Sequence, residues 1–209
     1  GKCSFHKEIM GESLHKVYKD MSTEQRKDLA KDIAELLCAI HNISLPKINK
    51  VLEQYSKKCR NENKTNLKDF NYNIAKEQLL ECSAGKINLD NFKTPIPTNG
   101  LALCHNDLHD ENIIINNEGK LSGFIDFGEA GINPRITDFF HLYRLDRKLM
   151  INIMSEYNKI SAYKIDVQAA DYQFLSNTGY TLEQRKNRPT FKPEVIRVLQ
   201  NNAFFSKTR

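Results

Sequence analysis

The sequence has 209 residues, of which 40% are hydrophobic and 27% are charged, a balance typical of a globular domain with one core. Its longest apolar runs fall far short of the roughly 20 residues that span a bilayer, and no signal peptide precedes them, so we expect no membrane partner. The net charge of +5 is dispersed, without an aromatic-interleaved basic stripe, which argues against a nucleic-acid partner.

The cysteines indicate the compartment of the protein, and the first residues indicate whether the sequence is part of a longer protein. The five cysteines are scattered and include no Cys-x-x-Cys pair, which is typical of free thiols, so we expect a cytoplasmic protein. The chain begins with Gly-Lys-Cys rather than with an initiator methionine, so we expect it to be a piece of a longer protein. Composition alone leaves the activity open.

The first part of the sequence predicts a connector followed by a helix. Residues 4–14 have the pattern of a short strand or connector that is broken at Gly11. A capping box at residues 22–25 and an apolar stripe over residues 29–40 predict a helix. His41 ends this helix. Nothing nearby in the sequence pairs with it, so we interpret it as a structural histidine rather than a ligand or a base.

Residues 46–99 are rich in lysine and asparagine, and no chemical motif is found there. Apolar spacing predicts helices over residues 48–58 and 67–82. The glycines and prolines of residues 84–100 predict mostly loop.

Short strands flank the polar centre of the sequence. The apolar segments 101–104, 113–115 and 121–125 predict strands, and residues 116–120 hold the Asn and Gly of a turn. From Pro134 onward the periodicity is helical, and further helices are expected over residues 149–160, 171–186 and 193–202. The expected fold is α+β, a mostly helical body with one small β-hairpin.

The stretch from residue 101 to 138 contains two motifs that predict one reaction. His105, Asp107 and Asn112 fit H-x-D-x-x-x-x-N, and Asp126 begins Asp-Phe-Gly at the end of a predicted strand. Phosphoryl transfer needs a carboxylate that orients a hydroxyl and takes its proton, a role that suits Asp107. Asn112 and Asp126 offer the hard oxygen ligands that Mg²⁺ prefers. The order of the motifs, with a hairpin between them, indicates a kinase-type phosphotransferase.

Two further residues are candidates for structural support. We expect the His105 ring to bond to backbone and hold the turn. Asp138 is a candidate for a buried carboxylate that braces the catalytic loop. An ordinary aspartate in the first turn of a helix, stabilised by the helix dipole, is an equally good interpretation of Asp138.

HNDLHDENIII, followed by GFIDFGEAGINPRITDFFHLY, resembles the aminoglycoside phosphotransferase family of small-molecule kinases, which have a protein-kinase-like fold. The resemblance implies that Asp107 is the catalytic aspartate, that Asn112 and Asp126 hold two Mg²⁺ ions, and that Asp138 is the brace. A protein kinase is not expected, because the loop contains HND rather than HRD and no A-P-E follows at a suitable distance.

The same resemblance implies a division of the chain. Residues 1–14 resemble the connector that leaves the nucleotide hinge, and residues 15–209 correspond to the helical C-terminal lobe, with the catalytic segment at 101–138. The family's N-terminal lobe is expected to be absent, because the sequence contains no Gly-rich loop and no strand lysine to clamp phosphates. We therefore expect this chain to be inactive by itself.

The activity implied for the full protein is transfer of the γ-phosphate of ATP or GTP to a hydroxyl of a small molecule. An aminoglycoside, as in antibiotic resistance, is the first choice. Such acceptors are cationic, and three carboxylates are candidates for contacting them: Asp110, Glu111 and Glu129. The alternatives are a kinase for choline, homoserine, methylthioribose, fructosamine or a macrolide, and a non-catalytic lobe that acts as a binding module.

Overall fold

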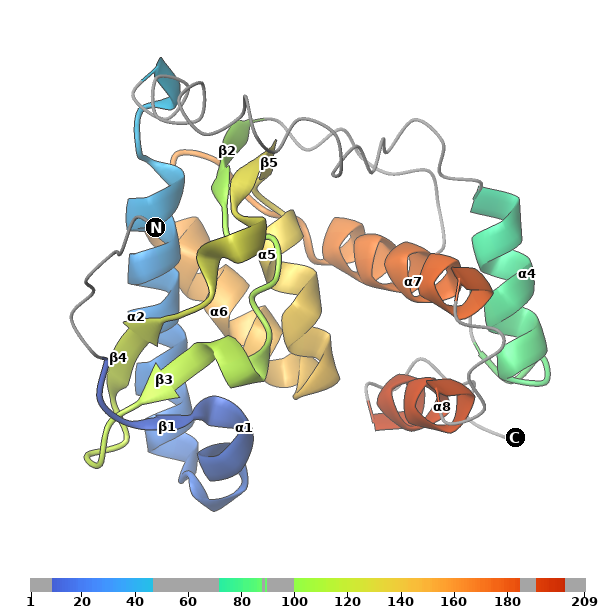
Figure 1. Ribbon diagram of the computed structural model, residues 1–209, viewed down its shortest axis with the longest axis horizontal. Helices are drawn as coiled ribbons and strands as arrows, with labels where there is room; N and C mark the ends of the chain where they lie inside the picture. The colour runs from blue at the N-terminus through green and yellow to red at the C-terminus, as the bar shows by residue number, and fades with distance from the viewer. Residues whose placement is uncertain (1–8, 47–71, 88, 90–99, 185–190, 202–209) are drawn as a thin grey trace, which may run out of the picture.

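The computed structural model of the chain describes these residues: 9–46, 72–87, 89, 100–184 and 191–201. The helix expected over residues 48–58, the start of that expected over 67–82 and most of the loop expected over 84–100 lie outside the described residues. Helices dominate the described part, with two small antiparallel sheets among them (Figure 1). The expected α+β class is confirmed.

The helix α2 (Thr23–His41) forms where the sequence predicts it. Ser22 Oγ accepts the backbone N–H of Gln25 at 3.2 Å, and Gln25 Oε1 accepts that of Ser22 at 2.8 Å, so the capping box is confirmed. The buried apolar stripe of α2 includes Leu29, Ile33 and Leu37. α2 packs against α6 (Arg147–Ile160), and Figure 1 shows the two helices side by side.

The first sheet has the strand order β1-β3-β4 and contains the predicted hairpin. Its strands are β1 (Glu12–Ser13), β3 (Ile113–Ile115) and β4 (Leu121–Phe124). In the hairpin turn, Asn116 Oδ1 accepts the backbone N–H of Lys120 at 2.9 Å, the local bonding for which asparagine is favoured in turns. Gly11, with φ +139°, brings the chain into β1. A Cβ there would lie 2.2 Å from the carbonyl oxygen of Ile115, so only glycine permits this approach.

A second sheet, which the sequence did not predict, pairs β2 (Leu101–Cys104) with β5 (Gly131–Pro134). The prediction of a single hairpin was therefore incomplete, and the helical region begins at α5 (Thr137–Phe140) rather than at Pro134. The β5 sequence, Gly-Ile-Asn-Pro, is dominated by residues that are depleted in strands, so no local signal marks its pairing. β2 forms as expected, although Leu101 at its start is 57% exposed.

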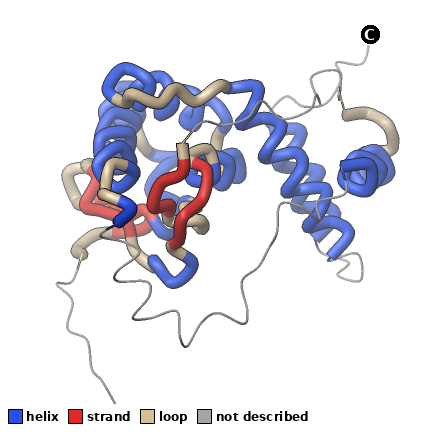
Figure 2. The backbone as a smooth tube through the Cα atoms, turned by 90° about the horizontal axis from the view of Figure 1, so that it is seen from above, coloured by secondary structure: helices blue, strands red, loops and turns tan. Residues whose placement is uncertain are grey.

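The remaining long helices are α4 (Tyr72–Cys82), α7 (Val167–Gln184) and α8 (Phe191–Asn201). α7 contacts both of the others and begins ahead of the predicted start at residue 171. Figures 1 and 2 show the sheets toward one end of the molecule and these helices toward the other, and one hydrophobic core joins the two ends. Of the helices that the structure describes, none combines the length and apolar character needed to cross a membrane.

Candidate active site

Asp138, in α5, is fully buried and contacts the loop that carries the H-x-D motif. Its Oδ2 accepts the backbone N–H of His105 at 2.9 Å, and its Oδ1 accepts that of Asn106 at 2.8 Å. A buried carboxylate needs such donors, because an unpaired charge in the interior is costly. The two bonds attach the start of the loop to α5, which is the contact that the hypothesis of a brace requires.

His41, the last residue of α2, provides a third donor to Asp138. Its Nε2–H lies 3.1 Å from Asp138 Oδ2, and its Nδ1 lies 2.9 Å from the hydroxyl of Tyr157 in α6. That hydroxyl oxygen also accepts Nη1–H of Arg135 at 3.0 Å. Burial raises the pKa of Tyr157, so the hydroxyl keeps its proton and can donate it to His41 Nδ1. His41 is a structural residue, as expected, but its carboxylate partner lies 97 residues along the chain.

Cys104 lies beside this pair. The ligand atoms of Cys104, His41 and Asp138 all lie within 4.8 Å of one another, the spacing of a possible metal site. However, burial raises the pKa of the Cys104 thiol, which therefore stays protonated, and its Sγ lies 3.4 Å from the carbonyl oxygen of Asn133. Asp138 already accepts three N–H groups. The cluster is therefore explained by packing and hydrogen bonding.

The His105 ring ties the loop to the end of β4. Its Nε2–H donates to the carbonyl oxygen of Ile125 at 2.7 Å, and the ring packs against Phe127 with centroids 4.5 Å apart. The N–H of Ile125 in turn donates to the carbonyl oxygen of Asn112 at 3.0 Å. These contacts hold the residue that precedes Asp126 against the H-x-D loop.

Asn106 has a left-handed backbone conformation, with φ +68°, which asparagine tolerates better than most residues. All of its polar groups have partners. Its N–H donates to the α5 carboxylate, and its carbonyl accepts Nε2–H of His141 at 2.9 Å. Its side chain donates to the carbonyl of Glu129 at 2.6 Å and accepts from Asn133 Nδ2 at 2.9 Å. The surroundings therefore hold this strained residue in place and direct the next one, Asp107.

Asp107 and Asn112 are joined in the structure. Asn112 ends the 3₁₀ turn η3 (Asp110–Asn112), and its Nδ2–H donates to the carbonyl oxygen of Asp107 at 2.9 Å. Asn112 Oδ1 accepts no hydrogen bond from the described residues. The Asp107 side chain is 42% exposed, and its Oδ2 lies 3.7 Å from Nε2 of His109. The Asp107 carboxylate is thus open to a ligand, whereas Asn112 is buried, with 6% of its surface exposed.

Asp126 follows β4 in a left-handed conformation, with φ +60° and ψ +62°, and the chain then enters the 3₁₀ turn η4 (Phe127–Glu129). It is exposed, and its carboxylate accepts no hydrogen bond from the part of the chain that the structure describes. The free oxygens of Asp126 and Asn112 are the hard ligands that Mg²⁺ takes in proteins. The donor chemistry therefore fits this metal.

The comparison with protein families decides what kind of protein carries this site. The model of the phosphotransferase enzyme family matches residues 3–160, most of the chain. The chain belongs to this family. The resemblance to aminoglycoside phosphotransferases, which rested on the motifs alone, is thereby confirmed.

Solved phosphotransferases share the fold. The GDP complex of aminoglycoside 2′-phosphotransferase-IIIa matches with a TM-score of 0.57 and 14% identity over 92% of this chain and 67% of that one. The streptomycin–ATP complex of APH(2″)-IIa gives 0.52 and 20% identity over 94% and 68%. Macrolide 2′-phosphotransferase type I gives 0.50 and 14% over 84% and 59%. At most about two thirds of these chains is matched, which fits a C-terminal lobe of the protein-kinase-like fold, as expected.

In this phosphotransferase, two histidines that the sequence analysis missed border the site. His109 Nδ1 accepts the backbone N–H of Glu111 at 3.2 Å, and its Nε2 lies 3.3 Å from Asn112 Nδ2 and 3.7 Å from Asp107 Oδ2. Burial lowers the pKa of His141, which is consistent with a neutral ring that donates to the Asn106 carbonyl. His109 lies inside the motif, and His141 follows the buried α5 carboxylate by about one helical turn. Either position in the sequence could have identified its histidine as a candidate site residue.

The three carboxylates expected to contact an acceptor differ in their surroundings. Glu111 and Glu129 are exposed. The Asp110 side chain is only 10% exposed, and its Oδ2 accepts Nδ1–H of His15 at 2.7 Å. Asp110 is therefore mostly buried and engaged by another part of the chain, and its contact with an acceptor stays a prediction.

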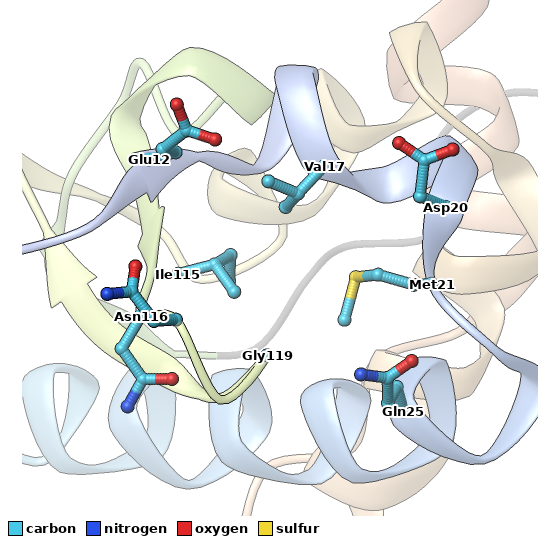
Figure 3. A pocket seen from close by; sticks show the side chains of 9 residues that line it. Glu12, Val17, Asp20, Met21, Gln25, Ile115, Asn116 and Gly119 are labelled. Atoms are coloured by element: carbon cyan, nitrogen blue, oxygen red, sulfur yellow. The ribbon is translucent and has the colours of Figure 1, made fainter.

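A surface hollow of about 340 Å³ lies away from these motifs (Figure 3). It is bordered by α1 (Leu14–Val17), the 3₁₀ turn η1 (Tyr18–Asp20), the start of α2 and the turn of the hairpin. Val17, Met21 and Ile115 form its apolar lining. None of the motif residues lines it, so the hollow is separate from the site described above.

Proposed function

We propose that the whole protein transfers the γ-phosphoryl group of ATP or GTP to a hydroxyl of a small molecule, with an aminoglycoside as the first choice. One observation carries the proposal: hydrogen bonds join Asp107, Asn112 and the residue before Asp126. Asn112 bonds to the Asp107 carbonyl through Nδ2 and to the N–H of Ile125 through its own carbonyl. Membership of the phosphotransferase family supports the same class of reaction.

Asp107 is the proposed base. Its half-exposed carboxylate would accept a hydrogen bond from the acceptor hydroxyl and direct that oxygen toward the γ-phosphorus. It would take the proton as the new O–P bond forms and the bond from the γ-phosphorus to the bridging oxygen breaks, which releases ADP or GDP. The His109 ring, with Nε2 3.7 Å from Asp107 Oδ2, borders the proposed base. The left-handed backbone at Asn106, held by its hydrogen bonds, would fix the backbone from which the Asp107 side chain extends.

Asn112 and Asp126 are the proposed ligands of two Mg²⁺ ions, through Asn112 Oδ1 and the Asp126 carboxylate. Bound Mg²⁺ would supply the positive charge that neutralises phosphate oxygens during transfer. Among the described residues, none donates a hydrogen bond to these oxygens. It holds their backbones together through the Ile125–Asn112 and His105–Ile125 bonds.

We further propose that residues 15–209 form the C-terminal lobe and that residues 1–14 lead to it from a nucleotide-binding lobe. The sequence contains no Gly-rich loop or clamp lysine, so the phosphate clamp would come from that lobe, and this chain alone would be inactive. A reaction that uses ATP or GTP with Mg²⁺ places the protein in the cytoplasm, where these are supplied.

The acceptor is proposed from charge and from the relatives. One related structure contains streptomycin and ATP, and another is a macrolide phosphotransferase, so hydroxyl-bearing antibiotics suit the fold. Aminoglycosides are polycations, and Glu111 and Glu129, exposed next to the motif residues, are suited to them. A macrolide is the second candidate. The intact set of Asp107, Asn112 and Asp126 argues against a non-catalytic binding module.

Nucleotide consumption by the whole protein tests the proposal, with a panel of aminoglycosides, a macrolide and small alcohols in the presence of Mg²⁺. We expect turnover with an aminoglycoside, and a loss of about 10²- to 10⁴-fold in kcat for Asp107→Asn. The melting temperature of this variant should stay unchanged, because no described residue donates a hydrogen bond to the Asp107 carboxylate.

The possible results separate the parts of the proposal. Turnover only with a macrolide or a small alcohol would replace the aminoglycoside as acceptor. Full activity of Asp107→Asn, or no turnover with any acceptor, would contradict phosphotransfer by this site. Single-turnover phosphorylation by the 209-residue chain alone would contradict the need for another lobe.

A further inference from the structure

A buried carboxylate in the catalytic loop is paired with a surface histidine from a distant part of the sequence. The Asp110 side chain is 10% exposed, whereas that of His15 is 62% exposed. His15 Nδ1–H donates to Asp110 Oδ2 at 2.7 Å. No other described residue bonds or pairs with the Asp110 side chain. An exposed ion pair contributes little, but here one partner is buried, and removal of His15 would leave that charge unpaired.

Asp110 begins the η3 turn, and Asn112 ends it. Through Asn112, the turn bonds to the Asp107 carbonyl at 2.9 Å and to the N–H of Ile125 at 3.0 Å. A rotation of η3 would therefore displace the proposed metal ligand Asn112 first, and would disturb the bonds that hold the proposed base and the residue before Asp126.

His15 is attached to a rigid part of the molecule. It follows Leu14, which is fully buried in the core. The preceding strand, β1, pairs with β3, so that Ser13 lies opposite Ile114. α1 contacts both β3 and η3. The His15–Asp110 bond thus connects a fixed element directly to the turn that ends in Asn112.

We infer that His15 is a positioning residue whose hydrogen bond to Asp110 sets the orientation of η3 and thereby the placement of Asn112 as a metal ligand. The inference rests on the proposed function, because phosphotransfer is its readout. His15 acts through Asp110 and touches neither substrate nor metal. Loss of the bond is expected to weaken the use of Mg²⁺ more than it weakens folding.

The Mg²⁺ dependence of the whole protein's activity tests this role. His15→Ala should raise the Mg²⁺ concentration that gives half-maximal rate by about ten-fold, the lower end of the range for groups that orient metal ligands. His15→Asn should restore most of the Mg²⁺ response, because the asparagine Nδ2–H lies near the position of Nδ1–H. His15→Gln places its amide farther out and should not restore it. Lys16→Ala, at the next exposed position of α1, is the matched control and should behave as wild type.

The outcomes distinguish this inference from the proposed function. An unchanged Mg²⁺ response in His15→Ala, with Asp107→Asn inactive, would overturn the inference alone. A lower melting temperature without a change in Mg²⁺ response would also overturn it, because the contact would then be only structural. If His15→Ala does not fold, His15→Gln takes its place, and a wild-type Mg²⁺ response of that variant would overturn the inference. An active Asp107→Asn would overturn the proposed function and the inference with it.

Discussion

Asp138 binds three N–H groups with two oxygens and has no exposed surface. Two of the donors are backbone groups of the loop, and the third is His41 at the end of α2. Such a carboxylate is stable in the interior only while all of its donors are in place. At the scale of single residues, the loop conformation therefore depends on one buried side chain of α5.

Asp138→Asn should reduce the free energy of unfolding by about 2–4 kcal/mol, because an amide N–H₂ would face N–H donors that have no other buried partner. Urea denaturation measures this loss. Asp126→Asn is the control: its carboxylate is exposed and unbonded, so its effect should stay within about 0.5 kcal/mol. Equal stabilities of the two variants would contradict the role given to Asp138.

At the scale of elements, α4 and α7 are the pair whose closeness depends on one glycine. A Cβ at Gly179 of α7 would lie 2.4 Å from the carbonyl oxygen of Ala75 and 2.7 Å from its Cα. Backbone cannot move aside as a flexible side chain does. The two helices can therefore pack at this distance only while residue 179 has no side chain.

Gly179→Ala should destabilise the protein by about 1–3 kcal/mol through overpacking. Helix propensity alone would predict the opposite sign, a gain of about 1 kcal/mol. Thermal or urea unfolding distinguishes the two, with Thr178→Ala in the same helix as a control of small effect. A Gly179→Ala protein more stable than wild type would show that α4 and α7 do not approach so closely.

The elements also show which parts of the fold a sequence can predict. The capping box of α2 and the turn of the hairpin involve groups a few residues apart, so their patterns were visible. β5 forms because β2 lies beside it, and its own Gly-Ile-Asn-Pro carries no strand signal. The apolar periodicity likewise predicts that His41 ends a helix. It does not predict that Asp138 is the partner of His41, because the two residues meet only in the folded chain.

The candidate site shows the same division. The reacting groups were predictable, because Asp107, Asn112 and Asp126 stand in motifs whose spacing fits one reaction. Their supports were harder to find. The burial of Asp110 and its bond to His15 could not be predicted, because a charged residue next to a motif does not reveal its partners in the folded chain.

At the scale of the whole molecule, segments far apart in the sequence meet at this site. α1 supplies His15, α2 supplies His41, and α5 supplies Asp138. The loop and the end of β4 supply the proposed reacting groups. The matched length of about two thirds of the related structures fits an assembly whose phosphate clamp comes from further residues. The proposed reaction therefore belongs to the whole protein.

The most direct test of the central claim is the melting temperature of the whole protein with Mg²⁺ and nucleotide. At a ligand concentration of about 100 times Kd, binding should add roughly 2.7 kcal/mol, a rise of several degrees for a protein of this size. The rise should disappear with a chelator and in Asp126→Ala, and should remain in Glu129→Ala. No rise in the wild type, or an undiminished rise in Asp126→Ala, would contradict a metal–nucleotide site at Asp107, Asn112 and Asp126.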